Sequence, residues 1–282
     1  MSPPGPPNEK NFQYPFNFSD FSPRKSLGQH FLKDPNIARF QIEALDLRAE
    51  EVVEVGGGLG ILTEILAEKA GHVWVYETDP ILAKYLRKKF ELVKNVSVLE
   101  EDALKADFPR SATVFASNIP YSISTPLAFK IARERFGRGV MLVQLEFAQK
   151  LSASPGSKLY RASSVAFQTM YGLQTLRTVS RFYFSPPPKV ESAILFFVQR
   201  QDSPLRHFGF EEISRYFLFL KKIFTARNRT IKSALRPLLP PNERRGIQNI
   251  LSESMLSQRV RDLDAEKFFA LYSRLQLDSI TD

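Results

Sequence analysis

Apolar runs and helical patterns alternate through residues 34–145, and this alternation limits the folds open to the chain. Runs that predict buried strands lie at residues 51–55, 72–77, 96–100, 112–117 and 140–145. The stretches at 34–45, 61–69, 80–92 and 125–135 have the apolar spacing of helices. Strands that alternate with helices in this way predict an α/β fold with a doubly wound, mostly parallel sheet.

The pattern changes toward the carboxyl end of the chain. Runs near 173–179 and 192–199 flank three consecutive prolines and predict two strands paired at the edge of the sheet. From about residue 204, apolar residues recur at helical spacing only. We therefore predict a disordered tail over 1–22, a Rossmann-like domain over 23–202 and a small helical domain over 203–282.

Composition narrows the function classes. The net charge of the 282 residues is +9 and the pI is about 9.6, which favours a polyanionic partner. There are no cysteines, so disulfides and thiolate zinc sites are excluded, and no other metal site is expected. No apolar run approaches the ~20 residues of a membrane span. Residues 2–14 have neither a signal core nor a transit-like pattern, so we expect a cytoplasmic protein.

A glycine turn follows the first strand of the alternating region. Gly56, Gly58 and Gly60 let the backbone pass close to a ligand at the start of a helix, but their spacing is not that of a dinucleotide fingerprint. Glu77 ends the next strand, where a carboxylate can hold ribose hydroxyls, and Asp102 follows the third. Together they predict a nucleoside-containing ligand, S-adenosylmethionine or a nicotinamide cofactor.

Asn118-Ile119-Pro120-Tyr121 follows the fourth strand. The Asn amide offers an acceptor to an exocyclic amine, Pro fixes the backbone, and Tyr offers a face for stacking. Taken alone, the four residues are equally compatible with an ordinary strand-to-helix turn. Their place at the same sheet edge as the two acids favours a pocket for a flat, amine-bearing ring.

The ordered set of motifs resembles the KsgA/Dim family of ribosomal RNA adenine dimethyltransferases. The similarity extends from about residue 26 to residue 236 and comprises the segments 26–32, 53–60, 77–79, 102–103, 118–126, 144–148, 155–160, 184–192 and 224–229. The glycine turn is weakly specific and the Asn-Ile-Pro-Tyr segment moderately so. The complete set of segments in this order is strongly specific for the family.

The resemblance implies a Rossmann-like methyltransferase that uses S-adenosylmethionine, with a small helical domain that binds RNA and the ribosome. The cofactor-binding residues it implies are Gln29, His30, Leu32, Gly56, Gly58, Glu77, Asp102 and Asn118. The catalytic residues it implies are Asn118, Ile119, Pro120, Tyr121 and Phe184. Tyr121 and Phe184 are expected to stack on the two faces of the target base.

A basic segment begins the helical region. Residues 206–236 contain eight Lys or Arg and two Asp or Glu, a net charge of +6 (8 − 2). Such a run is often only a solvated face, but beside a catalytic cleft it favours a track for RNA phosphates. The predicted RNA-binding residues are Lys221, Lys222, Arg227, Arg229, Lys232 and Arg236.

The implied reaction is dimethylation of the N6 amines of adjacent adenines in the 3′-terminal hairpin of small-subunit rRNA, within an immature subunit, by a monomeric enzyme. An Erm-type methyltransferase of large-subunit rRNA is the nearest alternative, because it shares the Asn-Ile-Pro-Tyr segment. A ribosome-assembly factor that acts chiefly by binding is the alternative from another class. A nicotinamide oxidoreductase is disfavoured by the glycine spacing.

Overall fold

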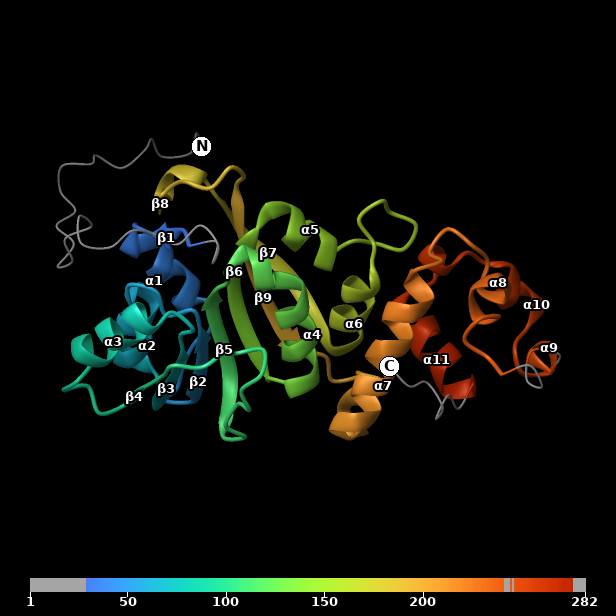
Figure 1. Cartoon of the computed structure of the whole chain (residues 1–282), viewed down its shortest axis with the longest axis horizontal. Helices are drawn as coiled ribbons and strands as arrows, with labels where there is room; N and C mark the ends of the chain where they lie inside the picture. Colours follow the sequence, from blue (N-terminus) through green and yellow to red (C-terminus); the bar gives the residue numbers. More distant parts are fainter. Residues whose placement is uncertain (1–28, 241–243, 245, 276–282) are drawn as a thin grey trace. The chain divides into compact units, whose positions relative to one another are not determined.

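The computed structural model describes residues 29–240, 244 and 246–275, so the predicted tail over 1–22 lies outside the described residues. Among them, seven strands form one sheet in the order β4-β3-β2-β5-β6-β9-β7 (Figure 1). The central strands are β2 (Glu51–Val55), β3 (His72–Tyr76), β4 (Val96–Leu99), β5 (Ala112–Asn118) and β6 (Arg138–Gln144). All four pairings among these five strands are parallel, which confirms the predicted parallel α/β sheet.

The strand order reverses between β2 and β5. In doubly wound sheets a ligand binds at such a point, beyond the carboxyl ends of the strands. Gly56 directly follows β2, and Asn118 is the last residue of β5. The topology therefore brings the glycine turn and the Asn-Ile-Pro-Tyr segment to the same edge from positions about sixty residues apart.

The chain folds into two compact units, each made of several segments. Of the described residues, unit 1 comprises 29–124, 137–146 and 175–196, and unit 2 comprises 125–136, 147–174 and those from 197 onward. The domain boundary at residue 202 stays a prediction.

Helices α1 (Pro35–Glu43), α2 (Ile61–Lys69) and α3 (Pro80–Lys89) belong to unit 1. Both α1 and α3 begin with a capping Asp followed by Pro: Asp34 accepts from Asn36 N–H at 2.8 Å and Asp79 from Ile81 N–H at 3.0 Å. Their apolar sides share one core with side chains of β2, β3, β5 and β6. The three helices thus cover one face of the sheet.

A second, short sheet joins two segments that are distant in sequence. Strand β1 (Phe31–Leu32) pairs antiparallel with β8 (Phe184–Ser185), and Lys33 N–H donates to the Tyr183 carbonyl at 2.8 Å. The sequence patterns did not predict this pair because each strand has only two residues, too few for a period. It ties the amino-terminal motif to the proline loop.

Unit 2 is mainly helical. It contains most of α4 (Ser124–Glu134) and α5 (Leu145–Leu151), together with α6 (Ala162–Met170), α7 (Phe210–Phe224), α8 (Ile231–Leu235), α9 (Ile247–Ile250), α10 (Glu253–Ser257) and α11 (Ala265–Leu275). Its core is aromatic: Tyr216 lies 5.2 Å from Tyr272 and 5.7 Å from Phe269 between ring centroids. The helices predicted from periodicity at α7 and α11 are confirmed.

Several predicted boundaries differ from the observed ones by one to three residues. Leu145, predicted to end a strand, is the first residue of α5, and its N–H still donates to the carbonyl of Glu191, next to β9, at 3.0 Å. The helix predicted to reach residue 92 ends at Lys89 and is followed by turns. The late strands β7 (Tyr171–Val179) and β9 (Ser192–Gln199) are neighbours at the sheet edge, as predicted. Of the described helices, none has the length and apolar content to cross a membrane.

Candidate active site

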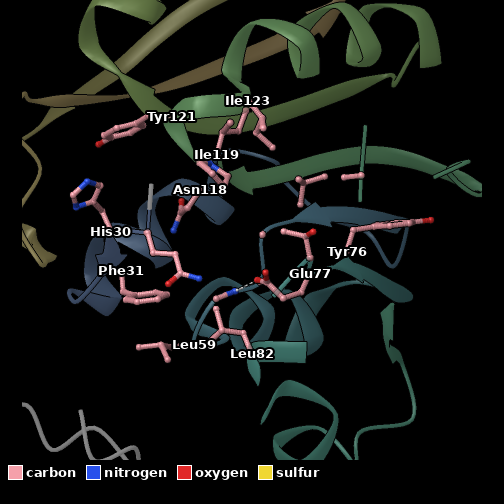
Figure 2. A pocket seen from close by; sticks show the side chains of 18 of the residues that line it. His30, Phe31, Leu59, Tyr76, Glu77, Leu82, Asn118, Ile119, Tyr121 and Ile123 are labelled. Atoms are coloured by element: carbon pink, nitrogen blue, oxygen red, sulfur yellow. Dashed lines mark hydrogen bonds between the residues drawn. The ribbon is translucent and has the colours of Figure 1, made fainter. Parts of the chain in front are cut away.

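A cleft opens at the carboxyl ends of β2, β3, β4 and β5, all within unit 1. It encloses roughly 1110 Å³ of empty space, part of it open to solvent. Figure 2 shows Glu77, Leu59 and Leu82 on one side, His30 and Tyr121 on the other, and Asn118 between them. Every residue that the sequence predicts to be catalytic or cofactor-binding lines this cleft: Gln29, His30, Leu32, Gly56, Gly58, Glu77, Asp102, Asn118, Ile119, Pro120, Tyr121 and Phe184.

The Glu77 carboxylate is held in place by backbone N–H groups. Its Oε2 accepts from Gly58 N–H and its Oε1 from Asp79 N–H, both at 3.0 Å, and its side chain is only 5% exposed. Burial raises the pKa of Glu77, and the two N–H donors partly oppose the shift. The carboxylate is therefore aimed into the cleft, and each oxygen keeps a lone pair for a ligand hydroxyl.

Asp79 extends this hydrogen-bonded chain to Gln29. Asp79 caps α3 and accepts from the Gln29 side-chain amide at 2.9 Å, which fixes Gln29 at the cleft wall.

Beneath the glycine turn, the fully buried Glu54 accepts from the Thr63 hydroxyl at 2.7 Å. Burial raises the pKa of Glu54 to about 8, and the nearby Glu77 adds to the shift. The sequence patterns did not single out Glu54 as a titrating group, because burial is a tertiary property.

The glycine turn leaves its backbone open to a ligand. Gly56 and Gly58 have φ of +75° and +56°, which side chains rarely adopt. A Cβ on Gly58 would lie 3.3 Å from the Phe31 ring, and one on Gly56 would lie 3.4 Å from Cδ of Pro120. A side chain at Gly58 would crowd the Phe31 ring, and at both positions the positive φ would strain any residue other than Gly.

Asp102 lies at the more exposed end of the cleft. Its Oδ1 accepts from Leu104 N–H at 2.9 Å, which orients the carboxylate at the start of a turn after β4. Its position matches the expected acceptor for an adenine amine, and that role stays a prediction.

Asn118 has an unsatisfied acceptor. Its Oδ1 is buried and has no hydrogen-bond partner among the described residues. Leaving a buried polar atom unpaired costs about 1–3 kcal/mol. The following residue is firmly held, because Ile119 N–H donates to the Leu142 carbonyl at 3.0 Å and the Ile119 side chain is 2% exposed. The unpaired acceptor therefore belongs to a residue that lines the cleft, where a ligand with a hydrogen-bond donor can pair with it.

Tyr121 begins the short turn after this strand and is half-buried. Its hydroxyl and that of Ser192 share a hydrogen bond of 2.7 Å, and burial raises its pKa. The His30 ring lies 5.7 Å from the Tyr121 ring between centroids, tilted by 33°. His30 Nδ1 in turn donates to the Pro186 carbonyl at 2.8 Å. His30 therefore connects the amino-terminal segment, the proline loop and Tyr121, and its predicted cofactor contact stays a prediction.

Phe184 lines the cleft and also belongs to the hydrophobic core. Only 4% of its surface is exposed, and strand β8 pairs it with Leu32, which is also 4% exposed. Its place before three prolines favoured a stacking residue over a core residue. The structure gives Phe184 a core position that borders the cleft, and its predicted stacking on the base stays a prediction.

The charge of the cleft discriminates between cofactors. Of the described residues that line it, Glu77, Glu101 and Asp102 are acidic and none is Lys or Arg. A pyrophosphate would find no cationic side chain here, whereas a nucleoside bearing a sulfonium cation meets carboxylates. Together with the two open glycines and the orphaned Asn118 oxygen, this donor set fits S-adenosylmethionine beside an amine-bearing base.

The predicted RNA-binding residues all lie in unit 2, in α7, in α8 or beside them. Arg229 and Arg236 are exposed and line a surface hollow with Arg244. Arg227 is different: it is half-buried, and its guanidinium donates to the carbonyls of Ser157 and Lys158 at 3.1 and 3.2 Å. Lys221 and Lys232 are exposed and Lys222 is half-buried. RNA contact by this set stays a prediction.

Sequence reasoning missed two contributors. Ser192 and Pro186 hold the Tyr121 hydroxyl and the His30 ring, and only the proline loop's return to β1 brings them there. Among the described residues, no group of three or more His, Cys, Asp or Glu is arranged to hold a metal ion.

The chain is similar to known methyltransferases over most of its length. A family model described as "Ribosomal RNA adenine dimethylase" matches residues 20–277. A Thermotoga maritima protein named ribosomal RNA small subunit methyltransferase A is 36% identical, covering 89% of this chain and 85% of the relative. A relative of the same name from a Geobacillus species is 33% identical and covers 97% of both chains.

Solved structures agree with these sequence matches. A dimethyladenosine transferase from Plasmodium falciparum superposes with a TM-score of 0.74 at 27% identity, covering 87% of this chain and 97% of the other. The 23S rRNA methyltransferase ErmE superposes with a TM-score of 0.63 at 29% identity, covering 87% and 99%. The predicted Rossmann-like methyltransferase fold is confirmed.

Proposed function

Because the chain belongs to the ribosomal RNA adenine dimethylase family, we propose that it dimethylates the N6 amines of adjacent adenines in the 3′-terminal hairpin of small-subunit rRNA. Family membership makes it a methyltransferase with S-adenosylmethionine as the methyl donor. The single observation that carries the choice of target is the buried, unpartnered Asn118 Oδ1 on the cleft floor. An exocyclic amine supplies the donor that this oxygen lacks.

The cofactor would lie over the glycine turn. Gly56 and Gly58 allow its methionine part to approach the backbone, Glu77 accepts from ribose hydroxyls, and Asp102 accepts from the adenine amine. When bound, it supplies a methyl group on a sulfonium. His30, Gln29 and Leu32 close this half of the cleft from the amino-terminal segment.

The target base would enter between Asn118 and Tyr121. An aromatic amine is a poor nucleophile because its lone pair is delocalised into the ring. Acceptors at Asn118 Oδ1 and the Ile119 carbonyl favour a tetrahedral nitrogen, whose lone pair then points to the methyl group. The methylated ammonium is acidic and loses its proton to solvent, so no strong base is needed. Orientation of this kind lowers a barrier by several kcal/mol.

Exposed cations of unit 2 support contact with RNA phosphates. The hollow formed by Thr225, Arg229, Ser233, Arg236 and Arg244 contains three Arg and no acidic residue among its described lining. Such contacts position RNA without reading its sequence and weaken steeply with salt. Arg229→Ala should reduce the slope of log binding constant against log salt concentration by about one, because one cation that contacts a phosphate is lost.

The test supplies labelled S-adenosylmethionine with unmethylated small or large ribosomal subunits, and the labelled bases are mapped. We expect N6-dimethyladenine at two adjacent positions near the 3′ end of small-subunit rRNA. Label confined to large-subunit RNA would overturn the proposal. It would support the second candidate, an Erm-type reaction, which the likeness to ErmE favours.

The cellular setting is a further part of the proposal. We place the enzyme in the cytoplasm, as a monomer that acts on an immature small subunit and assists its biogenesis. An inactive Asn118 variant that still restores subunit assembly in a deletion strain would assign that role to binding. Failure of the same variant to restore assembly would assign it to methylation.

A further inference from the structure

An exposed aromatic residue lies beside the cleft and has no role in the reaction described above. Phe182 is 55% exposed and belongs to the short turn Arg181–Tyr183 that leads into β8. The Arg181 guanidinium lies over its ring, 5.0 Å from the centroid. Single exposed apolar residues are common, so exposure alone does not indicate a function. The position of Phe182 and its contact with Arg181 do indicate one.

Phe182 lies close to the predicted base pocket. It is two residues before Phe184, which lines the cleft, so their Cα atoms are at most about 7 Å apart. The turn is held on both sides: Tyr183 N–H donates to the Ser180 carbonyl at 3.1 Å, and the Tyr183 carbonyl accepts from Lys33 N–H at 2.8 Å. The exposed ring is therefore presented by a fixed backbone, which lowers the entropy cost of binding.

The segment that contains Phe182 carries three cations, Arg177, Arg181 and Lys189, before the acidic Glu191. A second Arg–Phe pair lies in the same unit, where the Arg177 guanidinium is 5.7 Å from the centroid of the Phe40 ring, and Phe40 is 38% exposed. Arg and aromatic side chains together form the surfaces on which unpaired bases stack, while the cations neutralise phosphates.

We propose that the Phe182 ring, with Arg181 beside it, is a stacking surface for an unpaired RNA base that flanks the target adenine. A target base that leaves its stack exposes the faces of its neighbours, and an exposed ring at the cleft can receive one of them. Phe182 would then be a positioning residue, because it holds the strand while Asn118 receives the amine. The inference rests on the proposed function only in that the substrate is an adenine in RNA.

The experiment compares Phe182→Ala, Phe182→Leu and Phe182→Tyr. The measurements are kcat/KM for unmethylated subunits, the Kd of S-adenosylmethionine and the thermal unfolding midpoint. We expect Ala and Leu to lower kcat/KM by about tenfold, as loss of one stacked base predicts, and Tyr to stay within about twofold. Cofactor affinity and unfolding should not change, because the side chain is outside the cofactor half of the cleft.

Phe210→Ala is the matched control. Phe210 is 51% exposed and has the Arg133 guanidinium 4.0 Å from its ring centroid, but it belongs to unit 2. It should keep kcat/KM within about twofold. An equal loss in the Phe210 variant would overturn the inference, because the effect would then belong to any exposed Arg–Phe pair.

Two other outcomes would also overturn it. If Leu matches the wild type while Ala does not, the ring fills an apolar pocket of a ribosomal protein and no base stacks on it. If all three variants match the wild type, Phe182 has no role in binding. Should the wild type label only large-subunit RNA, the proposed function fails, but the same variants assayed on large subunits still test Phe182.

Discussion

The two halves of the cleft differ in how far the protein satisfies its own polar groups. In the cofactor half, Glu77 accepts from two backbone N–H groups and Asp79 accepts from Gln29. In the target-base half, Asn118 Oδ1 is buried and has no partner among the described residues. The first half is organised before any ligand binds. The second is completed only by a ligand that brings a donor, so selectivity for an amine resides there.

The largest expected effect is at Asn118. Asn118→Ala removes the unpaired acceptor, so methyl transfer should fall by about 10²–10³-fold, while the Kd of S-adenosylmethionine changes only a few fold. Single-turnover methylation and calorimetric titration measure the two quantities.

Thr113→Ala is the matched control, since Thr113 is an exposed residue near the other end of the same strand. If the Asn118 variant methylates as fast as the wild type, selectivity for an amine does not reside at Asn118, and the proposed difference between the two halves of the cleft is wrong.

At Glu77 we expect the opposite result to that at Asn118: cofactor affinity should fall more than the rate of methyl transfer. Glu77→Gln places an amide where two backbone N–H donors point, so at least one donor loses its acceptor. We expect cofactor affinity to weaken by about ten- to a hundredfold, with a loss of about 1–3 kcal/mol in the free energy of unfolding. If the variant binds cofactor normally but transfers methyl groups slowly, the assignment of Glu77 to the cofactor half is wrong.

Phe184 borders both the core and the cleft, so its substitution must separate packing from stacking. Phe184→Leu keeps most of the volume and should cost less than about 1.5 kcal/mol of stability. If the ring stacks on the base, turnover should still fall by about fivefold or more, with cofactor affinity unchanged. Turnover and cofactor affinity that fall together would make Phe184 a purely structural residue.

The last prediction concerns the stability of the fold and not methyl transfer, and its subject is the buried Glu54, two residues before the glycine turn. Its pKa is raised to about 8 in the fold and is near 4.5 when unfolded, so the folded state binds more protons between these values. Its contribution to stability is complete below about pH 4.5 and is lost as the pH rises toward 8, by at most about 1.4 kcal/mol per pH unit.

Glu54→Gln, which imitates the neutral acid, should flatten this part of the profile of unfolding free energy against pH. A variant profile that parallels the wild type between pH 5 and 8 would show that Glu54 is ionised in the fold.

Much of this organisation could be predicted from the chain itself. The alternation of strands and helices, the glycine turn and the polar residues after successive strands were each visible locally, because they depend on period, spacing and backbone freedom. The carboxyl ends of parallel strands meet at one edge, so the sequence predicts that Gly56, Glu77, Asp102 and Asn118 lie together, as they do in the cleft.

Tertiary structure decided what has no local signal. The two-residue strands β1 and β8 are too short for a pattern, yet their pairing brings His30 to Pro186. The pKa of Glu54 and the orphaned oxygen of Asn118 follow from burial, which depends on every surrounding element. The same holds for Arg227, whose two terminal guanidinium nitrogens donate to the carbonyls of Lys158 and Ser157, about seventy residues earlier in the chain. Sequence determined which groups reach the cleft, and packing determined which of them are left for a ligand.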